Sequence, residues 1–441
     1  MAKTGTFLLW YDTDEVGLLT AHHAGITLFS PFFPFSRPST QGELKMKTRT
    51  AVAFLQCILV LTTSAVFAQT DLAVTYQINA HHTGAIATPK LLPPLRTKWS
   101  VDLGATVSYP LIAEGKVFVI AGPDSNSHVN LYALDGSTGA TLWGPVQIPE
   151  GAYWWAAAAY DNGTVYVVPN TLSGLSGGEV IAYNAANGNE VWTANLPGQY
   201  FFTAPPAVGN GFVYAGGAGT GGTVYAVKES DGTVAWTASV MNGDNSSPVV
   251  TPGGIYVSYV CPQTYKFNAT TGKQIWHYSG PCEGGGGATP VYYNGLLYVR
   301  DWAGSYGHNG HILSTAKGLL VGNFDADFAP ALANKTAFYV QSSALKAVDT
   351  TTGNTLWSAT PTNGSYSTPP IYVNGIVYVG TSSGYLLGYH WNTGKSALSM
   401  NMGYAISASE TGSVGAPQSG LGAGQSMLVV PASTHLIALE R

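Results

Sequence analysis

Short runs of alternating apolar and polar residues, separated by tight turns, make up most of the chain from about residue 96 onward. A two-residue turn of the Asn-Gly type opens each unit, as at Asn162-Gly163 and Asn374-Gly375, and Asn-Gly favours the positive φ angles of a type I′ hairpin. The residues after the turn alternate as in Val165-Tyr166-Val167, which is the pattern of a β-strand. The other turns of this kind are Glu114-Gly115, Asn210-Gly211, Gly253-Gly254, Asn294-Gly295 and Asn334-Lys335, with a weaker one at Gly422-Ala423-Gly424.

A second phrase recurs between the hairpins: a turn residue, Gly, three further residues, then Trp. Its glycines are 49, 44, 40, 46, 35 and 41 residues apart, and the Trp is lost after Gly318 and Gly394. A period of this size made of short strands indicates a radial or stacked array. The complete phrases end at Trp143, Trp192, Trp236, Trp276 and Trp357, and one further tryptophan, Trp99, precedes the first hairpin.

The two ends of the repeat region complement each other. The chain closes on a third-strand pattern at 435–439 with no fourth strand after it, whereas Trp99 lies in a fourth-strand pattern at the start. We therefore predict an all-β fold over residues 96–441: an eight-bladed β-propeller of four-stranded antiparallel blades, closed by the N-terminal strand completing the last blade. Such closure removes both open sheet edges.

A targeting signal precedes the repeats. From Met46 the chain has a basic start, an apolar stretch and an end at Val66-Phe67-Ala68, which is the organisation of a secretory signal peptide. We predict that 46–68 is this signal, that 69–95 is an N-terminal arm and that 1–45 lies upstream of the true start of translation. The alternative is a long cytosolic tail on an uncleaved anchor. Cys57 lacks lipobox neighbours, so we expect no lipid anchor.

The amino-acid composition limits the partners and the cellular location that we expect. Charged residues are only 9% of the chain and the net charge is −5, without a basic run, so nucleic-acid binding is not expected. The apolar stretch of the signal is too short for a comfortable membrane span, so we expect an exported monomer, periplasmic or extracellular, with no transmembrane span. Cys261 and Cys282 remain after signal removal and predict a disulfide; the alternative is two unpaired thiols.

The motif Ala-x-Asp-x-x-Thr-Gly-x-x-x-Trp, present from Ala133 to Trp143 and from Ala347 to Trp357, resembles the PQQ-like repeat family. The lead-in His82-Thr83-Gly84 resembles that family's N-terminal arm. The family contains the eight-bladed quinoprotein alcohol dehydrogenases and the non-enzymatic scaffold of the outer-membrane barrel assembly machinery. The resemblance implies that the repeat Trp is structural and wedges between neighbouring blades.

The dehydrogenases of this family share further features: an adjacent cysteine pair that clamps the quinone PQQ, a Ca²⁺ held by oxygen ligands and an Asp base. Cys261 and Cys282 are 21 residues apart, and there is no haem-binding Cys-x-x-Cys-His. The enzymatic residues of the family therefore cannot be carried over, and we predict no catalytic residue.

Two unlike faces are expected, one with short turns and one with longer, more varied connections, and function usually lies on such loops. Residues entering the first strands converge on the central channel there and form an aromatic and acidic mouth that suits a sugar, a peptide or a divalent cation. The candidate ligand-binding residues are Trp154, Trp155, Tyr200, Phe201, Asp244, Asn245, Glu283, Asp327 and Tyr366. Because Ca²⁺ takes six to eight oxygen ligands, the metal candidates are Asp244, Asp325 and Asp327. The alternative is that these aromatics pack between blades and these acids face solvent.

From the sequence we expect a non-catalytic propeller that binds a ligand or protein through its loop face and channel mouth. One alternative is a PQQ-dependent dehydrogenase that has lost the cysteine pair. Another is a partner in outer-membrane protein assembly.

Overall fold

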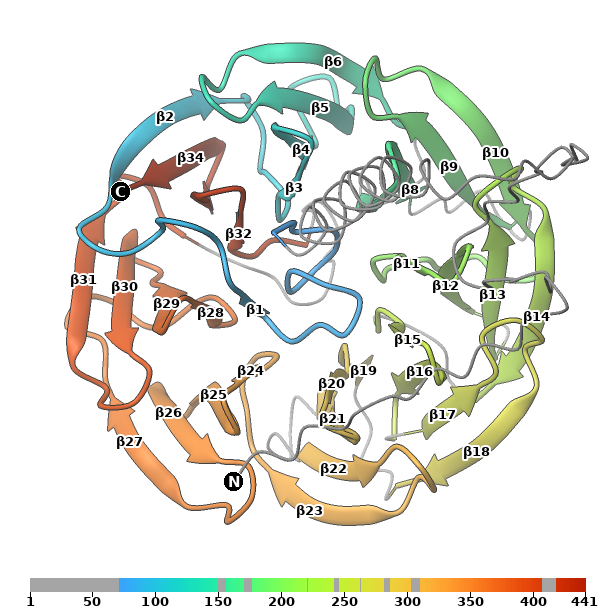
Figure 1. The fold of residues 1–441 in the computed structure, drawn as a ribbon. Helices are drawn as coiled ribbons and strands as arrows, with labels where there is room; N and C mark the ends of the chain where they lie inside the picture. The colour runs from blue at the N-terminus through green and yellow to red at the C-terminus, as the bar shows by residue number, and fades with distance from the viewer. Residues whose placement is uncertain are drawn as a thin grey trace, which may run out of the picture. The chain divides into compact units, whose positions relative to one another are not determined.

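A computed structural model of the chain describes residues 71–149, 156–169, 177–219, 221–241, 246–261, 263–280, 286–302, 310–406 and 418–441. Eight antiparallel sheets stand in a ring around a central axis (Figure 1). The predicted eight-bladed β-propeller is confirmed. Blade 1 contains β3 (Leu111–Ala113), β4 (Lys116–Ala121), β5 (Asn130–Asp135) and β6 (Thr141–Gln147). Blade 2 contains β7 (Ala156–Asp161), β8 (Thr164–Pro169), β9 (Gly178–Asn184) and β10 (Glu190–Leu196).

The middle of the sequence supplies four further blades. Blade 3 contains β11 (Ala207–Gly209), β12 (Phe212–Ala218), β13 (Gly222–Lys228) and β14 (Val234–Val240). Blade 4 contains β15 (Val249–Thr251), β16 (Gly254–Tyr259), β17 (Gln263–Phe267) and β18 (Gln274–Ser279). Blade 5 contains β20 (Val291–Tyr293), β21 (Leu296–Trp302), β22 (Gly310–Ser314) and β23 (Leu320–Phe324), with the short β19 (Gly286–Gly287) paired to β21. Blade 6 contains β24 (Ala331–Ala333), β25 (Thr336–Gln341), β26 (Ala344–Asp349) and β27 (Thr355–Ala359).

The last two blades involve the N-terminal part of the chain. Blade 7 contains β28 (Ile371–Val373), β29 (Ile376–Gly380), β30 (Tyr385–His390) and β31 (Ser396–Asn401), and β1 (Ala85–Ile86) runs parallel to β28. Blade 8 contains β32 (Gly422–Gly424), β33 (Met427–Ala432), β34 (His435–Glu440) and β2 (Arg96–Asp102).

The ring closes between the start and the end of the repeat region. Strand β2 pairs antiparallel with β34, with Arg96 opposite Glu440. An ion pair of 2.8 Å joins the Arg96 guanidinium to the Glu440 carboxylate, although exposed pairs of this kind contribute little to stability. The predicted closure by the Trp99 strand is confirmed.

The hairpins between first and second strands follow the predicted turn chemistry, with two shifts. Asn162 and Gly163 have φ values of 42° and 79°, as a type I′ turn requires. In blade 4 the turn lies on Pro252-Gly253, one residue before the predicted Gly253-Gly254, because proline's fixed φ suits the first turn position. In blade 8 the turn lies on Gln425-Ser426, after the predicted glycines, and both residues have positive φ.

The outer strand of each blade carries a β-bulge beside the repeat Trp position. In blade 2, for example, the ladder between β9 and β10 shifts between Glu190 and Trp192. A bulge re-aims side chains, so Val191 is 56% exposed whereas Trp192 turns toward the neighbouring blade. The indole Nε1 of Trp192 donates to the carbonyl oxygen of Glu229 in blade 3 at 3.0 Å.

This contact recurs around the ring and forms the seams between blades. The Nε1 donors and carbonyl acceptors are Trp99 to Gly136, Trp143 to Ala185, Trp236 to Ala269, Trp276 to Thr315 and Trp357 to Trp391. Apolar side chains of adjacent blades complete each seam, as where Phe118 of blade 1 stacks on Tyr160 of blade 2 with ring centroids 5.8 Å apart. These six indoles thus join neighbouring blades.

Candidate functional site

The N-terminal arm lies across the middle of the ring (Figure 1). Residues 71–84 form hydrogen bonds with an inner segment of every blade in turn. The pairs, in blade order, are Ala73 with Ile112, Val74 with Tyr160, Thr75 with Pro206, Ala80 with Val250, His81 with Tyr292, Thr83 with Leu332, Gly84 with Tyr372 and Asp71 with Gln425. The arm is therefore a hub that ties all eight blades together.

His82 is the most deeply placed polar side chain of this hub. It is fully buried, and its Nδ1 and Nε2 lie 2.8 Å and 2.9 Å from the carbonyl oxygens of Tyr76 and Pro248. Burial lowers the pKa of His82 to about 4, although both carbonyls favour the protonated ring. His82 holds the arm to blade 4, while His81 packs against Tyr292 with ring centroids 5.0 Å apart.

Two of the predicted mouth residues form one aromatic surface. Tyr200 and Phe201 are half-buried, and their ring centroids are 5.0 Å apart. The backbone of Phe201 pairs with that of Ala218, and the Tyr200 hydroxyl donates to the Gly219 carbonyl oxygen at 3.0 Å. Both rings are thus fixed beside the end of β12.

The other described candidates are engaged with residues of their own or the neighbouring blade; the Tyr366 hydroxyl lies 3.3 Å from the Ala359 carbonyl oxygen of blade 6. Tyr366 is 6% exposed and its hydroxyl lies 2.9 Å from that of Tyr389; burial raises the pKa of Tyr366 far above its usual range. Asp325 is exposed and accepts a hydrogen bond of 3.3 Å from Gln341. The backbone N–H of Asp327 donates to Val340 at 2.7 Å.

Several predicted residues lie outside the described ranges: Trp154, Trp155, Asp244, Asn245, Glu283 and Cys282. Cys261 is described and is 4% exposed, with a φ of 62°. The mouth, its metal candidates and the disulfide therefore stay predictions for these residues.

The described residues do not fit the metal and quinone of the dehydrogenases. In those ranges, no group of three or more His, Cys, Asp or Glu side chains is placed to hold a metal ion. The sequence has no adjacent cysteine pair to clamp a quinone.

One acidic contact escaped the sequence analysis. Glu229 follows β13 and lies in the seam with blade 2, where its Oε2 is 3.5 Å from the Tyr166 hydroxyl. Burial, and then the Asp161 carboxyl, raise the pKa of Glu229 to about 7. The equivalent positions at the other Trp seams are Gly136, Ala185, Ala269, Thr315 and Trp391, and none of them carries a carboxyl. A carboxyl at this position of the repeat was the available signal.

Comparison with known proteins identifies the family. The family model described as "Outer membrane protein assembly factor BamB" matches residues 96–199 and 176–397. The chain belongs to the PQQ-like repeat β-propeller family. It is 26% identical over 301 residues to the outer membrane protein assembly factor BamB of Moranella endobia, covering 64% of this chain and 74% of that protein.

Two further relatives have other names. The chain is 24% identical over 285 residues to the tetrathionate hydrolase of Acidithiobacillus ferrooxidans, covering 60% of this chain, and spans about half (48%) of that protein's length. The quinohemoprotein alcohol dehydrogenase of Comamonas testosteroni has a similar structure, with a TM-score of 0.63, 15% identity and coverage of 84% of this chain and 81% of that one. The likeness to this dehydrogenase is one of fold. Within the described ranges, no helix has the length and apolarity needed to cross a membrane.

Proposed function

We propose that this chain is an exported, non-catalytic β-propeller that binds a protein partner through its loop face and channel mouth. The observation that carries the proposal is the fixed aromatic surface of Tyr200 and Phe201, whose rings are 5.0 Å apart and partly exposed. Rigid aromatic side chains contribute large contact areas at low entropic cost and are enriched at binding hot spots.

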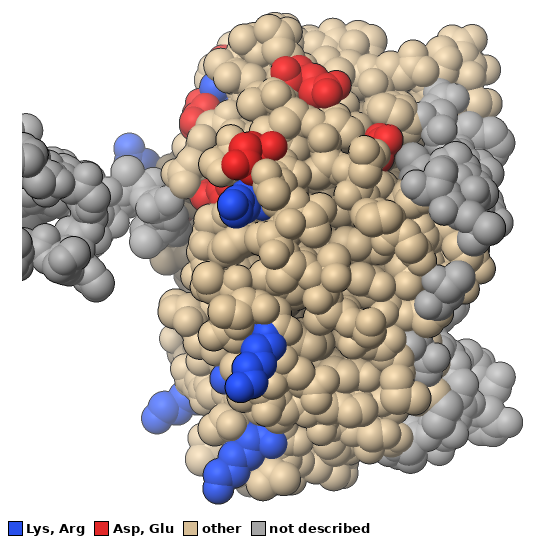
Figure 2. Space-filling view, turned by 90° about the vertical axis from the view of Figure 1, so that its right-hand side faces the viewer, with Lys and Arg blue, Asp and Glu red and all other residues tan. Residues whose placement is uncertain are grey.

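The low charge of the surface supports the same conclusion. On the side shown in Figure 2, most charged side chains lie in the left half of the view, and most of the remaining described surface is uncharged. Charged residues are depleted at the cores of protein interfaces. In the proposed complex, Trp154, Trp155, Asp244, Asn245, Glu283 and Asp327 surround the aromatic pair at the mouth, and a disulfide between Cys261 and Cys282 restrains the adjoining loop.

A photo-crosslinking amino acid at position 200 tests this proposal in the native host. The matched control is the same amino acid at Ile275, which is 50% exposed on the outer strand β18. We expect a discrete crosslinked protein from position 200 that Phe201→Ala weakens. Equal crosslinking from positions 200 and 275, or none from position 200, would overturn the loop-face assignment.

A more specific candidate is a role in outer-membrane protein assembly. The family model and the Moranella endobia relative both carry the name of an outer membrane protein assembly factor. If this role holds, the protein crosslinked at position 200 is a component of an outer-membrane assembly machine. A crosslinked protein of another kind leaves the binding scaffold in place and removes the assembly role.

The competing proposal is a PQQ-dependent dehydrogenase that has lost the cysteine pair. It rests on the shared fold with the quinohemoprotein alcohol dehydrogenase. Titration with PQQ and Ca²⁺ in a dye-reduction assay separates the two: the scaffold gives no cofactor-dependent reduction, whereas a saturable rate establishes the enzyme.

A further inference from the structure

The seam between blades 7 and 8 differs from the other seams. Leu398 of β31 stands where six other blades carry the repeat Trp. Blade 8 also lacks the Gly turn that receives an indole elsewhere, because its third strand β34 and fourth strand β2 come from opposite ends of the repeat region. Residues 91–95, which lead into β2, take the place of that turn.

A cavity of about 590 Å³, open to solvent, lies at this seam. Half of its lining residues are exposed: Leu92, Pro94, His390 and Ser399. Sites for small molecules usually measure about 300–1,000 Å³ and are mostly apolar with a few polar groups. The apolar lining residues are Leu92, Pro93, Pro94, Ile376, Ala397 and Leu398. His390 and Ser399 supply the polar part of the lining.

Hydrogen bonds fix the chain segment that leads into the lining residues Leu92, Pro93 and Pro94. The side chain of Asn374 donates from Nδ2 to the Leu91 carbonyl oxygen at 3.1 Å and accepts from the Thr88 N–H at 3.1 Å. Leu92 is fixed further by an N–H bond of 3.0 Å to the Lys90 carbonyl oxygen, and Ile376 is 3% exposed. The cavity is therefore preformed, which reduces the entropic cost of binding.

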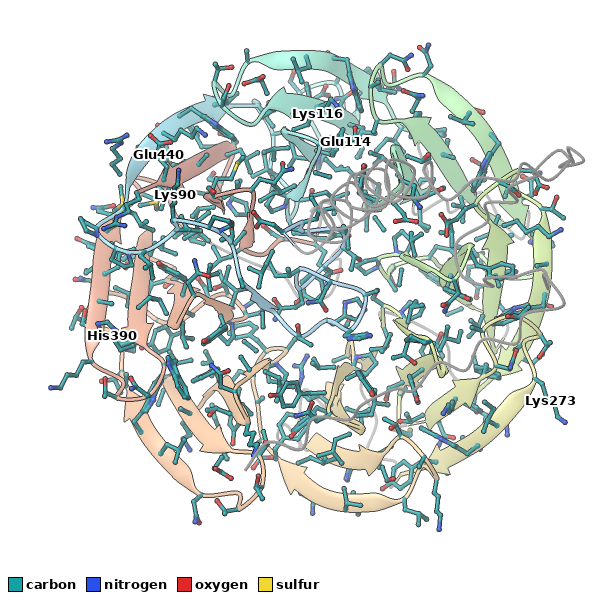
Figure 3. All side chains as sticks on the ribbon, viewed as in Figure 1. Lys90, Glu114, Lys116, Lys273, His390 and Glu440 are labelled. Carbon is teal, nitrogen blue, oxygen red and sulfur yellow. The ribbon has the colours of Figure 1, made fainter. Side chains whose placement is uncertain are left out.

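His390 gives the cavity a hydrogen-bonding end. His390 ends the third strand of blade 7, β30, at the repeat position that Asp135 occupies in blade 1 and Asn268 in blade 4. Those two side chains accept N–H groups of their own turns, from Thr138 at 2.8 Å and Thr271 at 2.9 Å. The ring of His390 forms no hydrogen bond with another described residue and lines the cavity instead; Figure 3 labels it in blade 7.

The other seams show which chemistry suits this space. In each of six of them an indole ring packs between blades and its N–H donates to a backbone carbonyl. The lining here contains no Lys, Arg, Asp or Glu, so nothing in it compensates a ligand charge. Proline rings and aliphatic side chains present C–H surfaces against which an aromatic face packs.

We propose that the cavity between blades 7 and 8 is a binding site for a small, neutral aromatic molecule of the indole class. The ring lies against Pro93, Pro94 and Leu398, and its polar group hydrogen-bonds with His390. This site is independent of the loop-face proposal, because its residues belong to β29, β30, β31 and the arm.

Ligand-observed ¹⁹F NMR with 5-fluoroindole as the probe tests the site on the full mature chain. We expect saturable binding to the wild type with a Kd in the order of 0.1–1 mM, as suits so small a molecule. Leu398→Trp fills the cavity with the side chain of the repeat and should abolish binding. The matched control, Leu142→Trp, places the same ring at a 49% exposed position of β6 and should leave binding unchanged.

A second variant keeps the test valid if Leu398→Trp destabilises the fold. His390→Asn retains a side chain found at the same place in blades 2 and 4, at Asn184 and Asn268, and removes the imidazole. Loss of one hydrogen bond should weaken binding by about 3- to 10-fold. Absence of saturable binding to the wild type, or unchanged binding by both Leu398→Trp and His390→Asn, would overturn the proposal.

Discussion

The ring of Trp143 in blade 1 lies directly against Gly188 in the turn of blade 2: a Cβ at position 188 would stand 2.7 Å from Trp143 Cε3. The same approach joins Trp236 to Gly272, where the distance would be 2.6 Å. Blade 5 has Gly322 at its Trp position, and the facing Gly353 of blade 6 has nothing within 4 Å of such a Cβ. The loss of one Trp therefore leaves one turn uncovered.

This pair of turns separates backbone strain from packing. Gly188 and Gly353 have nearly equal φ values of 75° and 72°, so an alanine at either costs about 1–2 kcal/mol in conformational strain. Only Gly188→Ala also pushes against an indole, which adds about 1–3 kcal/mol. Urea denaturation should show the larger loss for Gly188→Ala. If both variants lose the same free energy of unfolding, the Trp143 ring moves aside at no measurable cost.

The buried imidazole of His82 should make the propeller acid-sensitive. Its pKa is about 4 in the folded state against 6.5 in the unfolded chain, so the unfolded state binds the extra proton between these values. The contribution of neutral His82 to the free energy of unfolding is then fully present above pH 6.5. It falls as pH drops toward 4, by about 1.4 kcal/mol per pH unit at the steepest. Urea midpoints measured across this range should show the decline, and His82→Asn should flatten it. If the urea midpoint of His82→Asn falls with pH as steeply as that of the wild type, other titratable groups cause the decline.

Glu229 should act in the opposite direction. Burial and Asp161 raise its folded pKa to about 7, so the folded state keeps a proton that the unfolded state releases near pH 4.5. Its contribution is present at low pH and is lost as pH rises from about 4.5 to 7. Glu229→Gln should therefore match the wild type at pH 4 and exceed it at pH 8 in thermal melts.

Asp161 provides the control for this effect. Because it is the charge that disfavours ionised Glu229, Asp161→Asn should raise wild-type stability at pH 8 but add little to Glu229→Gln. Additive gains from the two substitutions would show that the carboxyls do not interact.

Mass spectrometry tests the predicted disulfide between Cys261 and Cys282. Native, unreduced protein should be lighter than the reduced protein by two hydrogen atoms and should carry no thiol that alkylates under denaturing conditions. Cys261→Ser should leave one alkylatable thiol at Cys282. Two alkylatable thiols in unreduced wild type would show that the bridge is absent.

The sequence predicted the ring well because each of its signals is local. Asn162-Gly163 specifies a hairpin, Gly188 a left-handed turn and Trp192 a seam, and repetition turns these weak signals into one architecture. The unpaired pattern around Trp99 even predicted how the ring closes. The turn of blade 8 was predicted at Gly422-Ala423-Gly424 but lies at Gln425-Ser426. No local pattern indicated this turn, because neither Gln nor Ser usually adopts positive φ.

The sites were less accessible to sequence reasoning because they depend on residues far apart in the chain. The circuit of the arm around the channel follows from contacts such as Tyr160 with Val74 and Tyr372 with Gly84, which no local pattern records. The cavity beside Leu398 arises from a missing turn as well as a missing Trp. An absence of that kind becomes visible only once the eight seams are compared in space.

The hub also constrains the order in which the molecule is made. Residues 71–102 leave the ribosome before the propeller strands, yet Arg96 pairs with Glu440 across 344 residues, and Asp71 bonds with Gln425. Contacts of such long sequence range are slow to form. Residues 71–102 must therefore wait for residues 425–440, and ring closure and insertion of the hub become the concluding events of folding. Until then β34 has an open edge, which is the stage at which the growing protein is most exposed to aggregation.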